Sequence, residues 1–203
     1  MRHAEGQDLV RRNVSALVDT PRGRQGRPSQ SLTMEQASAL LEAAEASRLH
    51  AFIVLCLLTG VRSEEARALM WEHVDLEAGT ISVWRSVRAH GDTKTNRSRR
   101  TLKLPEIAVE ALRRQRERQA AERAQAGELR QEHGLVFTTS VGTGYESHNV
   151  RRDYRRVTAA AGLGARWVPK ELRTSFVSMM SYQGVPVEEI AGWPGMPARG
   201  RPR

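Results

Sequence analysis

Apolar residues recur at helical spacing in the first part of the chain. Thr33 is followed three residues later by Gln36, the arrangement of a capping box, and Leu40 and Ala44 continue one apolar face. This pattern predicts a helix that begins near Thr33. A second helix is expected over residues 50–59, which are apolar almost all round and therefore suit the centre of a core.

A short turn separates the second helix from a third. Gly60 is placed to end the apolar helix, and Ser63 is placed to cap the segment SEEARALMW, whose first turn carries two acids where the helix dipole favours them. We therefore expect a helix over residues 63–71.

The pattern changes to alternation after this helix. Residues 74–87 alternate apolar and polar side chains on both sides of a Glu-Ala-Gly turn, which predicts two strands of a hairpin. Residues 99–104 alternate again and predict a third strand. Pro105 then starts a long helix, and further helices are expected from Ser147 and over residues 169–183. The expected fold is mainly α, with a small three-stranded antiparallel β-sheet.

Composition and charge narrow the functional classes. The 203 residues carry 32 Lys+Arg against 23 Asp+Glu, a formal net charge of +9, and a surface this basic favours nucleic acid as the partner. Cys56 is the single cysteine, which excludes disulfides and cysteine-based zinc clusters. Residues 51–58 form the longest apolar run, far short of the ~20 residues that span a bilayer. With no apolar signal segment at the N-terminus, we expect a cytoplasmic protein that binds no metal and no membrane.

Three segments carry candidate chemistry. TGVRSEEA places Arg62 before a helix start, TKTNRSRR forms a basic turn with Lys94 between two strands, and PKELRTSF places Lys170 and Arg173 on one face at another helix start. Guanidinium groups near free helix N–H groups suit a phosphate. Taken singly, each segment is also explained as an ordinary solvated basic surface.

In this order and spacing, the three segments resemble the catalytic domain of the tyrosine recombinases, the phage integrase family. The resemblance covers roughly residues 29–190. It implies that residues 1–30 are a remnant and linker from a missing N-terminal core-binding domain, that residues 31–191 are an incomplete catalytic domain, and that the fold is that of the family. The ancestral reaction would be DNA strand cleavage and rejoining through a 3′-phosphotyrosine, without a cofactor.

The resemblance also assigns roles to matching residues. Arg62 and Arg173 would clamp the phosphate, Glu65 would support Arg62, and Lys94 would protonate the leaving 5′ oxygen. Lys170 stands where the family usually has histidine, so its acid–base role departs from the pattern. Clamping arginines suit the reaction because charge builds on the phosphate oxygens in the transition state.

Double-stranded DNA is the partner that the resemblance implies. The basic residues expected to contact DNA come from the hairpin and from the helix that begins at Ser147. They are Arg97, Arg99, Arg100, Arg151 and Arg152. Intact members of the family assemble as a tetramer on DNA, an assembly that is doubtful for this fragment.

The end of the chain departs from the family. After the second box the family has a Leu-Gly-His turn and then the nucleophilic tyrosine, whereas residues 192–203 read GWPGMPARGRPR. A single-base shift near Gly192 would allow Leu-Ala-Gly-His-Ala, so we interpret residues 192–203 as an aberrant, frameshifted tail. The three tyrosines precede this point: Tyr154 and Tyr182 are expected to pack within the fold, and Tyr145 to lie in a loop.

Three functions remain open from the sequence. The chain could keep the recombinase activity, with the tyrosine supplied elsewhere or another residue attacking. It could instead be a non-catalytic DNA-binding fragment, which is the interpretation we favour for the chain as it stands. A regulatory helical domain without recombinase chemistry is the third, and the three ordered boxes argue against it.

Overall fold

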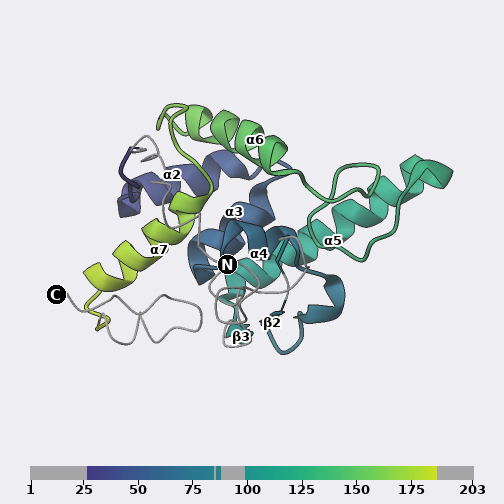
Figure 1. The fold of residues 1–203 in the computed structure, drawn as a ribbon, viewed down its shortest axis with the longest axis horizontal. Helices are drawn as coiled ribbons and strands as arrows, with labels where there is room; N and C mark the ends of the chain where they lie inside the picture. The colour runs from purple at the N-terminus through teal and green to yellow at the C-terminus, as the bar shows by residue number, and fades with distance from the viewer. Residues whose placement is uncertain (1–26, 85, 88–98, 187–203) are drawn as a thin grey trace, which may run out of the picture.

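The computed structural model describes residues 27–84, 86–87 and 99–186 of the chain. Helices surround a central helix, and a small sheet lies at one edge of the molecule (Figure 1). The elements in chain order are α2 (Met34–Ala44), α3 (His50–Thr59), α4 (Ser63–Arg67), η2 (Trp71–His73), β1 (Val74–Asp75), β2 (Thr80–Val83), β3 (Arg100–Lys103), α5 (Glu106–Ala126), η4 (Gly127–Leu129), α6 (Ser147–Ala160) and α7 (Lys170–Tyr182).

The start of α2 confirms the predicted capping box. Thr33 Oγ1 accepts from the Gln36 amide at 3.2 Å, and Gln36 Oε1 accepts from the Thr33 amide at 3.0 Å. Two backbone donors that the helix leaves unpaired are therefore satisfied. The apolar face buries Ala37, Leu40 and Ala44.

Helix α3 forms the centre of the core, as its all-round apolar sequence predicts. It packs against α2, α4, α5 and α7. Phe52 is fully buried and meets Phe137 edge to face, with ring centroids 5.4 Å apart. Because α3 touches the elements on both sides of it, it fixes the spacing between α5 and α7, which flank it in Figure 1.

The predicted three-stranded antiparallel sheet is confirmed, in the order β1-β2-β3. Ile81 pairs with Leu102 and Val83 pairs with Arg100. These four side chains are buried, so they lie on the core side of the sheet. The alternation of β3 therefore turns Arg100 inward, although it is a charged residue.

The third helix is shorter than predicted. It ends at Arg67 rather than continuing to Trp71, and Arg62 rather than Ser63 occupies its N-cap position. The reason is a competing backbone pairing: Met70 forms a β-bridge with Leu135, and the Trp71 amide donates to the Gly134 carbonyl at 2.9 Å. That pairing requires extended backbone, which ends the helix.

Gln119, a polar residue of α5, binds the loop that follows α5 in the chain. Gln119 Nε2 donates to the Val136 carbonyl at 3.0 Å and to Thr138 Oγ1 at 2.9 Å, while its Oε1 accepts from Trp71 Nε1 at 2.7 Å. Gln119 is buried. Because buried amides need such partners, these bonds fix the position of residues 136–138 beside Gln119 on α5.

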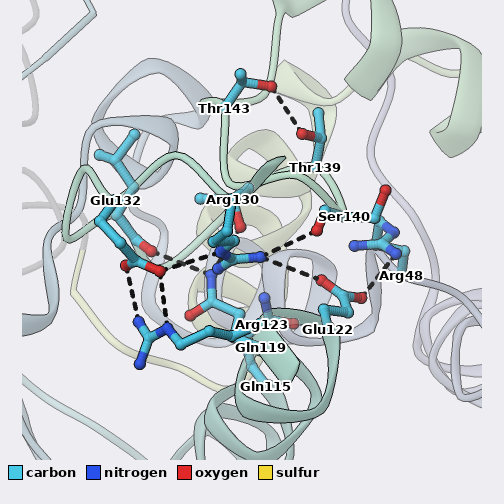
Figure 2. Close-up of polar contacts among 12 residues, drawn as sticks. Arg48, Gln115, Gln119, Glu122, Arg123, Arg130, Glu132, Thr139, Ser140 and Thr143 are labelled. Atoms are coloured by element: carbon cyan, nitrogen blue, oxygen red, sulfur yellow. Dashed lines mark hydrogen bonds and ion pairs between the residues drawn. The ribbon is translucent and has the colours of Figure 1, made fainter. Parts of the chain in front are cut away.

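Ion pairs continue this attachment along α5 (Figure 2). Glu122 forms ion pairs with Arg48 at 2.7 Å and with Arg130 at 3.9 Å. The two carboxylate oxygens of Glu132 accept hydrogen bonds from Nε and Nη2 of Arg123, each at 2.7 Å. The loop from residue 127 to residue 145 is thus bound to α5 through several side chains.

The contact between Gly60, in the turn from α3 to α4, and Phe176 of α7 can be tested by substitution. Gly60 has φ +64°, and a Cβ there would lie 2.5 Å from Cδ1 of Phe176 on α7. We expect Gly60→Ala to lower the free energy of unfolding by about 3 kcal/mol, since left-handed strain and a clash add together. The measurement is urea denaturation.

Gly162→Ala is the matched control. Gly162 has φ +73°, but a Cβ added there would meet nothing within 4 Å. This variant should lower the free energy of unfolding by only about 1 kcal/mol, because it introduces backbone strain without a clash. Equal losses for the two variants would show that the Gly60–Phe176 contact does not constrain the turn.

Candidate functional site

The turn between α3 and α4 places Arg62 at the start of α4. Gly60 adopts the left-handed conformation that ends α3, and the Thr59 hydroxyl donates to the Leu55 carbonyl at 2.6 Å. The backbone then extends through Arg62, whose amide donates to Glu65 Oε2 at 2.9 Å. The position of Arg62 is therefore fixed by its main chain, while its side chain remains about one-third exposed.

Glu65 is the centre of a cluster of charged side chains. Its buried carboxylate accepts from Arg62 Nη1 at 2.8 Å and from Arg100 Nη2 at 2.7 Å. Burial alone would raise the pKa of Glu65, but the hydrogen bonds and charge of Arg100, together with the Arg62 contacts, outweigh it and hold that pKa below its usual value. Glu65 is therefore an anion at neutral pH.

Arg173 approaches the same cluster from α7. Its Nη1 donates to the carbonyl of Gly60, 113 positions earlier in the chain. Burial lowers the pKa of Arg173 to about 10, with repulsion from Arg62 as the next cause. The guanidinium is still protonated at neutral pH. Arg62 and Arg173, separated widely in sequence, thus lie within electrostatic reach of each other.

A basic cleft adjoins this cluster. It has a volume of about 600 Å³ and includes Ser63 and Glu64 at the start of α4. Residues from the first turns of α6 and α7 also line it, so backbone N–H groups contribute positive potential there. The cationic side chains of its lining are Arg27, Arg67, Arg151, Arg155 and Lys170.

The basic residues singled out in the sequence take different places. Lys170 and Arg151 are exposed and line the cleft. Arg152 is exposed but outside the cleft lining, and it pairs with Asp153 at 3.0 Å. Arg99 is exposed at the edge of β3.

Of the remaining basic residues, the structure describes only Arg100. The Arg100 side chain is only 2% exposed and faces Glu65, so the structure places it beneath the surface on which it was expected. Lys94 and Arg97 lie outside the described residues, as do residues 192–203 of the interpreted tail.

Sequence reasoning missed several residues of the site. Arg155 stands four positions after Arg151, a helical spacing that could have identified it. Arg67 is half-buried, and its Nε donates to the Tyr145 carbonyl at 2.6 Å. Glu171 binds Arg27 through both of its carboxylate oxygens. No local signal distinguishes Glu171 from an ordinary acid at a helix start.

The tyrosines differ from expectation in one case. Tyr154 is fully buried and Tyr145 is 5% exposed, whereas Tyr182, which was expected to pack, is 87% exposed at the end of α7. The prediction for Tyr182 is wrong because helical spacing alone does not say whether a neighbouring element covers the position. Burial raises the pKa of Tyr145 to about 12.

The described residues also define what the site does not contain. Among them, no group of three or more His, Cys, Asp or Glu side chains is arranged to hold a metal ion. No helix in the described part of the chain is long and apolar enough to cross a membrane.

Comparison with known proteins decides the family. The phage integrase family matches residues 30–195 of the chain. The chain belongs to the phage integrase family. It is 50% identical over 202 residues to an integrase of Streptomyces ambofaciens, an alignment that covers 94% of this chain and 52% of that protein. The chain spans about half the length of the curated relatives it matches.

Solved structures share the integrase fold. The XerA recombinase matches with a TM-score of 0.69 at 22% identity, over 86% of this chain and 58% of that one. The Tn1549 transposon integrase in complex with transposon right end DNA matches with a TM-score of 0.68 at 18% identity, over 96% of this chain and 67% of that one. The mainly helical architecture with its three-stranded sheet is therefore that of the catalytic domains of tyrosine recombinases.

The Glu65 cluster of this integrase-family chain predicts a measurable cost of neutralisation. We expect Glu65→Gln to lower the free energy of unfolding by about 3 kcal/mol, because removing one partner of a buried ion pair leaves the other charge uncompensated. Glu110→Gln is the control, since the Glu110–Arg114 pair is half exposed on both sides. It should change stability by less than ~0.5 kcal/mol.

Comparing the wild type with Glu65→Gln at different pH values tests the charge of Glu65. Because the folded-state pKa of Glu65 is depressed, its stabilisation is present above the unfolded pKa and is lost as pH falls through the folded pKa. The stability difference between the wild type and Glu65→Gln should therefore shrink in acid. A difference that stays constant on acidification would contradict the charged state assigned to Glu65.

Proposed function

We propose that this chain binds the backbone of duplex DNA as the catalytic domain, residues 31–191, of a site-specific recombinase. The observation that carries the proposal is that Arg62 and Arg173, from helices far apart in sequence, lie within electrostatic reach of each other beside a basic cleft. Arg62 pairs with Glu65, and Arg173 donates to the Gly60 carbonyl. Two guanidinium groups at one place suit a phosphodiester, whose oxygens accept paired N–H donors. The binding of relatives to DNA supports the same partner.

The chemistry of strand cleavage assigns a part to each side chain. Arg62 and Arg173 would stabilise the charge that develops on the phosphate oxygens during in-line attack. Lys94, which lies outside the described residues, would protonate the leaving 5′ oxygen. Lys170 faces the cleft, where its ammonium group would hold a phosphate oxygen.

Glu65 and Arg100 would act beneath this surface. Glu65 orients Arg62 through both its backbone amide and its side chain. Arg100 balances the buried carboxylate from β3, so its burial favours support of the clamp over direct contact with DNA. Arg67, Arg151 and Arg155 would extend contact along the DNA backbone through the cleft.

We also propose that these 203 residues bind DNA without joining to it covalently. Of the three tyrosines, Tyr145 and Tyr154 are buried. Tyr182 is exposed, but it lies about 13 Å beyond Arg173 along the axis of α7, at the helical rise of ~1.5 Å per residue. A nucleophile must lie about 3 Å from the phosphorus, opposite the leaving oxygen.

Salt dependence of DNA binding tests the role of the cleft. The double variant Arg151→Ala/Arg155→Ala should weaken binding to duplexes of different sequence alike. It should reduce the slope of log K against log salt by roughly 2, because each lost phosphate contact removes about 0.9. Fluorescence anisotropy at several salt concentrations measures this.

Arg113→Ala/Arg114→Ala is the matched control, since these two α5 residues line a different surface pocket. It removes the same charge but should leave the slope unchanged. Equal effects of the two double variants would show that net charge, and not the cleft, binds DNA.

Covalent attachment is tested separately on a nicked duplex that carries the recombination site. We expect no protease-sensitive shifted band on a denaturing gel, because Tyr145 and Tyr154 are buried and Tyr182 lies far along α7 from Arg173. A full-length relative on its own nicked site is the positive control. A shifted band that disappears in Tyr182→Phe would identify Tyr182 as the nucleophile and overturn this part of the proposal.

A further inference from the structure

The segment that leads into α2, residues 27–32, is tied to α7 by one buried carboxylate. Glu171 is 1% exposed, and its two oxygens receive four donors. Oε1 accepts from Arg27 Nη1 at 2.7 Å and from the Gln30 amide at 2.9 Å. Oε2 accepts from Arg27 Nη2 at 2.9 Å and from the Val168 amide at 3.0 Å. We call residues 27–32 the lead-in segment.

The contact with Arg27 spans 144 positions of the chain and has a two-point geometry. Arg27 Nη2 also donates to the Arg166 carbonyl at 2.6 Å, which ties the same guanidinium to the loop before α7. Burial would raise the pKa of Glu171, but the hydrogen bonds from Arg27, Gln30 and Val168 lower it below its usual value. The carboxylate is therefore charged, and each of its oxygens accepts two hydrogen bonds from these partners.

A second attachment lies one turn further along α7. Ser175 is fully buried; its hydroxyl accepts from the Leu32 amide at 2.9 Å and donates to the Glu171 carbonyl at 2.7 Å. Residues four apart lie on one face of a helix. Glu171 and Ser175 thus form a continuous face of α7 that binds the backbone of the lead-in segment.

Arg173 and Lys170 are the basic groups of α7 to which the proposed function assigns phosphate contacts. Arg173 stands two positions after Glu171, about 200° around the helix, and reaches Gly60. Lys170 immediately precedes Glu171, and both residues line the basic cleft. The first turn of α7 is therefore attached to the lead-in segment through Glu171 and to the turn at Gly60 through Arg173.

We propose that Glu171 is a positioning residue: by binding the lead-in segment, it sets the placement of Arg173 and Lys170 for phosphate. This inference rests on the proposed function. The lead-in segment joins α2 to the preceding part of the chain, so its position is coupled to the phosphate site through the first turn of α7. Linkage requires the coupling to be reciprocal: DNA at the phosphate site strengthens the attachment of the lead-in segment.

Amide hydrogen exchange and DNA binding test this on the 203-residue chain. Glu171→Gln removes the charge that Arg27 binds. It should speed exchange of the Gln30 and Leu32 amides at least tenfold and weaken binding to a generic duplex about three- to tenfold. Arg27→Lys keeps the positive charge in the cleft but cannot make the two-point contact, so it should reproduce both effects. It serves also if Glu171→Gln fails to fold.

The control is Glu132→Gln, which breaks another two-point arginine pair, at the loop after α5. It should leave both readouts unchanged. A merely structural role would not produce the reciprocal effect: saturating DNA should slow exchange of the Gln30 and Leu32 amides in the wild type and have a smaller effect in Arg27→Lys.

The outcomes separate the two proposals. Wild-type protein that binds DNA with no slowing at Gln30 and Leu32, or an Arg27→Lys variant with unchanged affinity, overturns the positioning role alone. Failure of the wild type to bind any duplex overturns the proposed function, and the coupling with it.

Discussion

The buried carboxylate of Glu65 is the interaction on which the site depends. A charge taken out of water is costly unless it is paired and hydrogen-bonded, and Glu65 meets both conditions through Arg62 and Arg100. The partners come from the start of α4 and from β3, so the pair joins the helical layer to the sheet. The inward turn of Arg100 follows from this need, since an alternating strand places an arginine on its core face only where a counter-charge is available.

The local signals in the sequence were sufficient for most of the fold. The capping box at Thr33, the left-handed turn at Gly60 and the alternation before and after the hairpin each fix backbone conformation within a few residues. The end of α4 could not be predicted in this way. It is decided by backbone pairing of Met70 with Leu135, and no pattern near residue 70 indicates a partner so distant in the chain.

The site was predictable in residue type and only partly in arrangement. Arg62 and Arg173 stand at recognisable helix starts, and their meeting follows from the way α3 packs between α4 and α7. Burial is harder to foresee: Arg100 and Arg99 are neighbours in one basic run, yet strand alternation hides the first and exposes the second. The pairing of Glu171 with Arg27 depends wholly on tertiary structure, because an acid in the first turn of a helix is explained equally well by the dipole.

Charge balance connects these features to chemistry. Arg62, Arg100 and Arg173 bring three positive charges close to the carboxylate of Glu65, and burial together with mutual repulsion already lowers the pKa of Arg173. Nearby like charges raise the free energy of the folded protein, and an added anion lowers it. A phosphodiester bound beside the exposed third of Arg62 would supply that anion, so repulsion among the three arginines would favour its binding. On the face of α7 opposite Arg173, Glu171 and Ser175 bind the backbone of the lead-in segment, so the helix that carries Arg173 is attached on both sides.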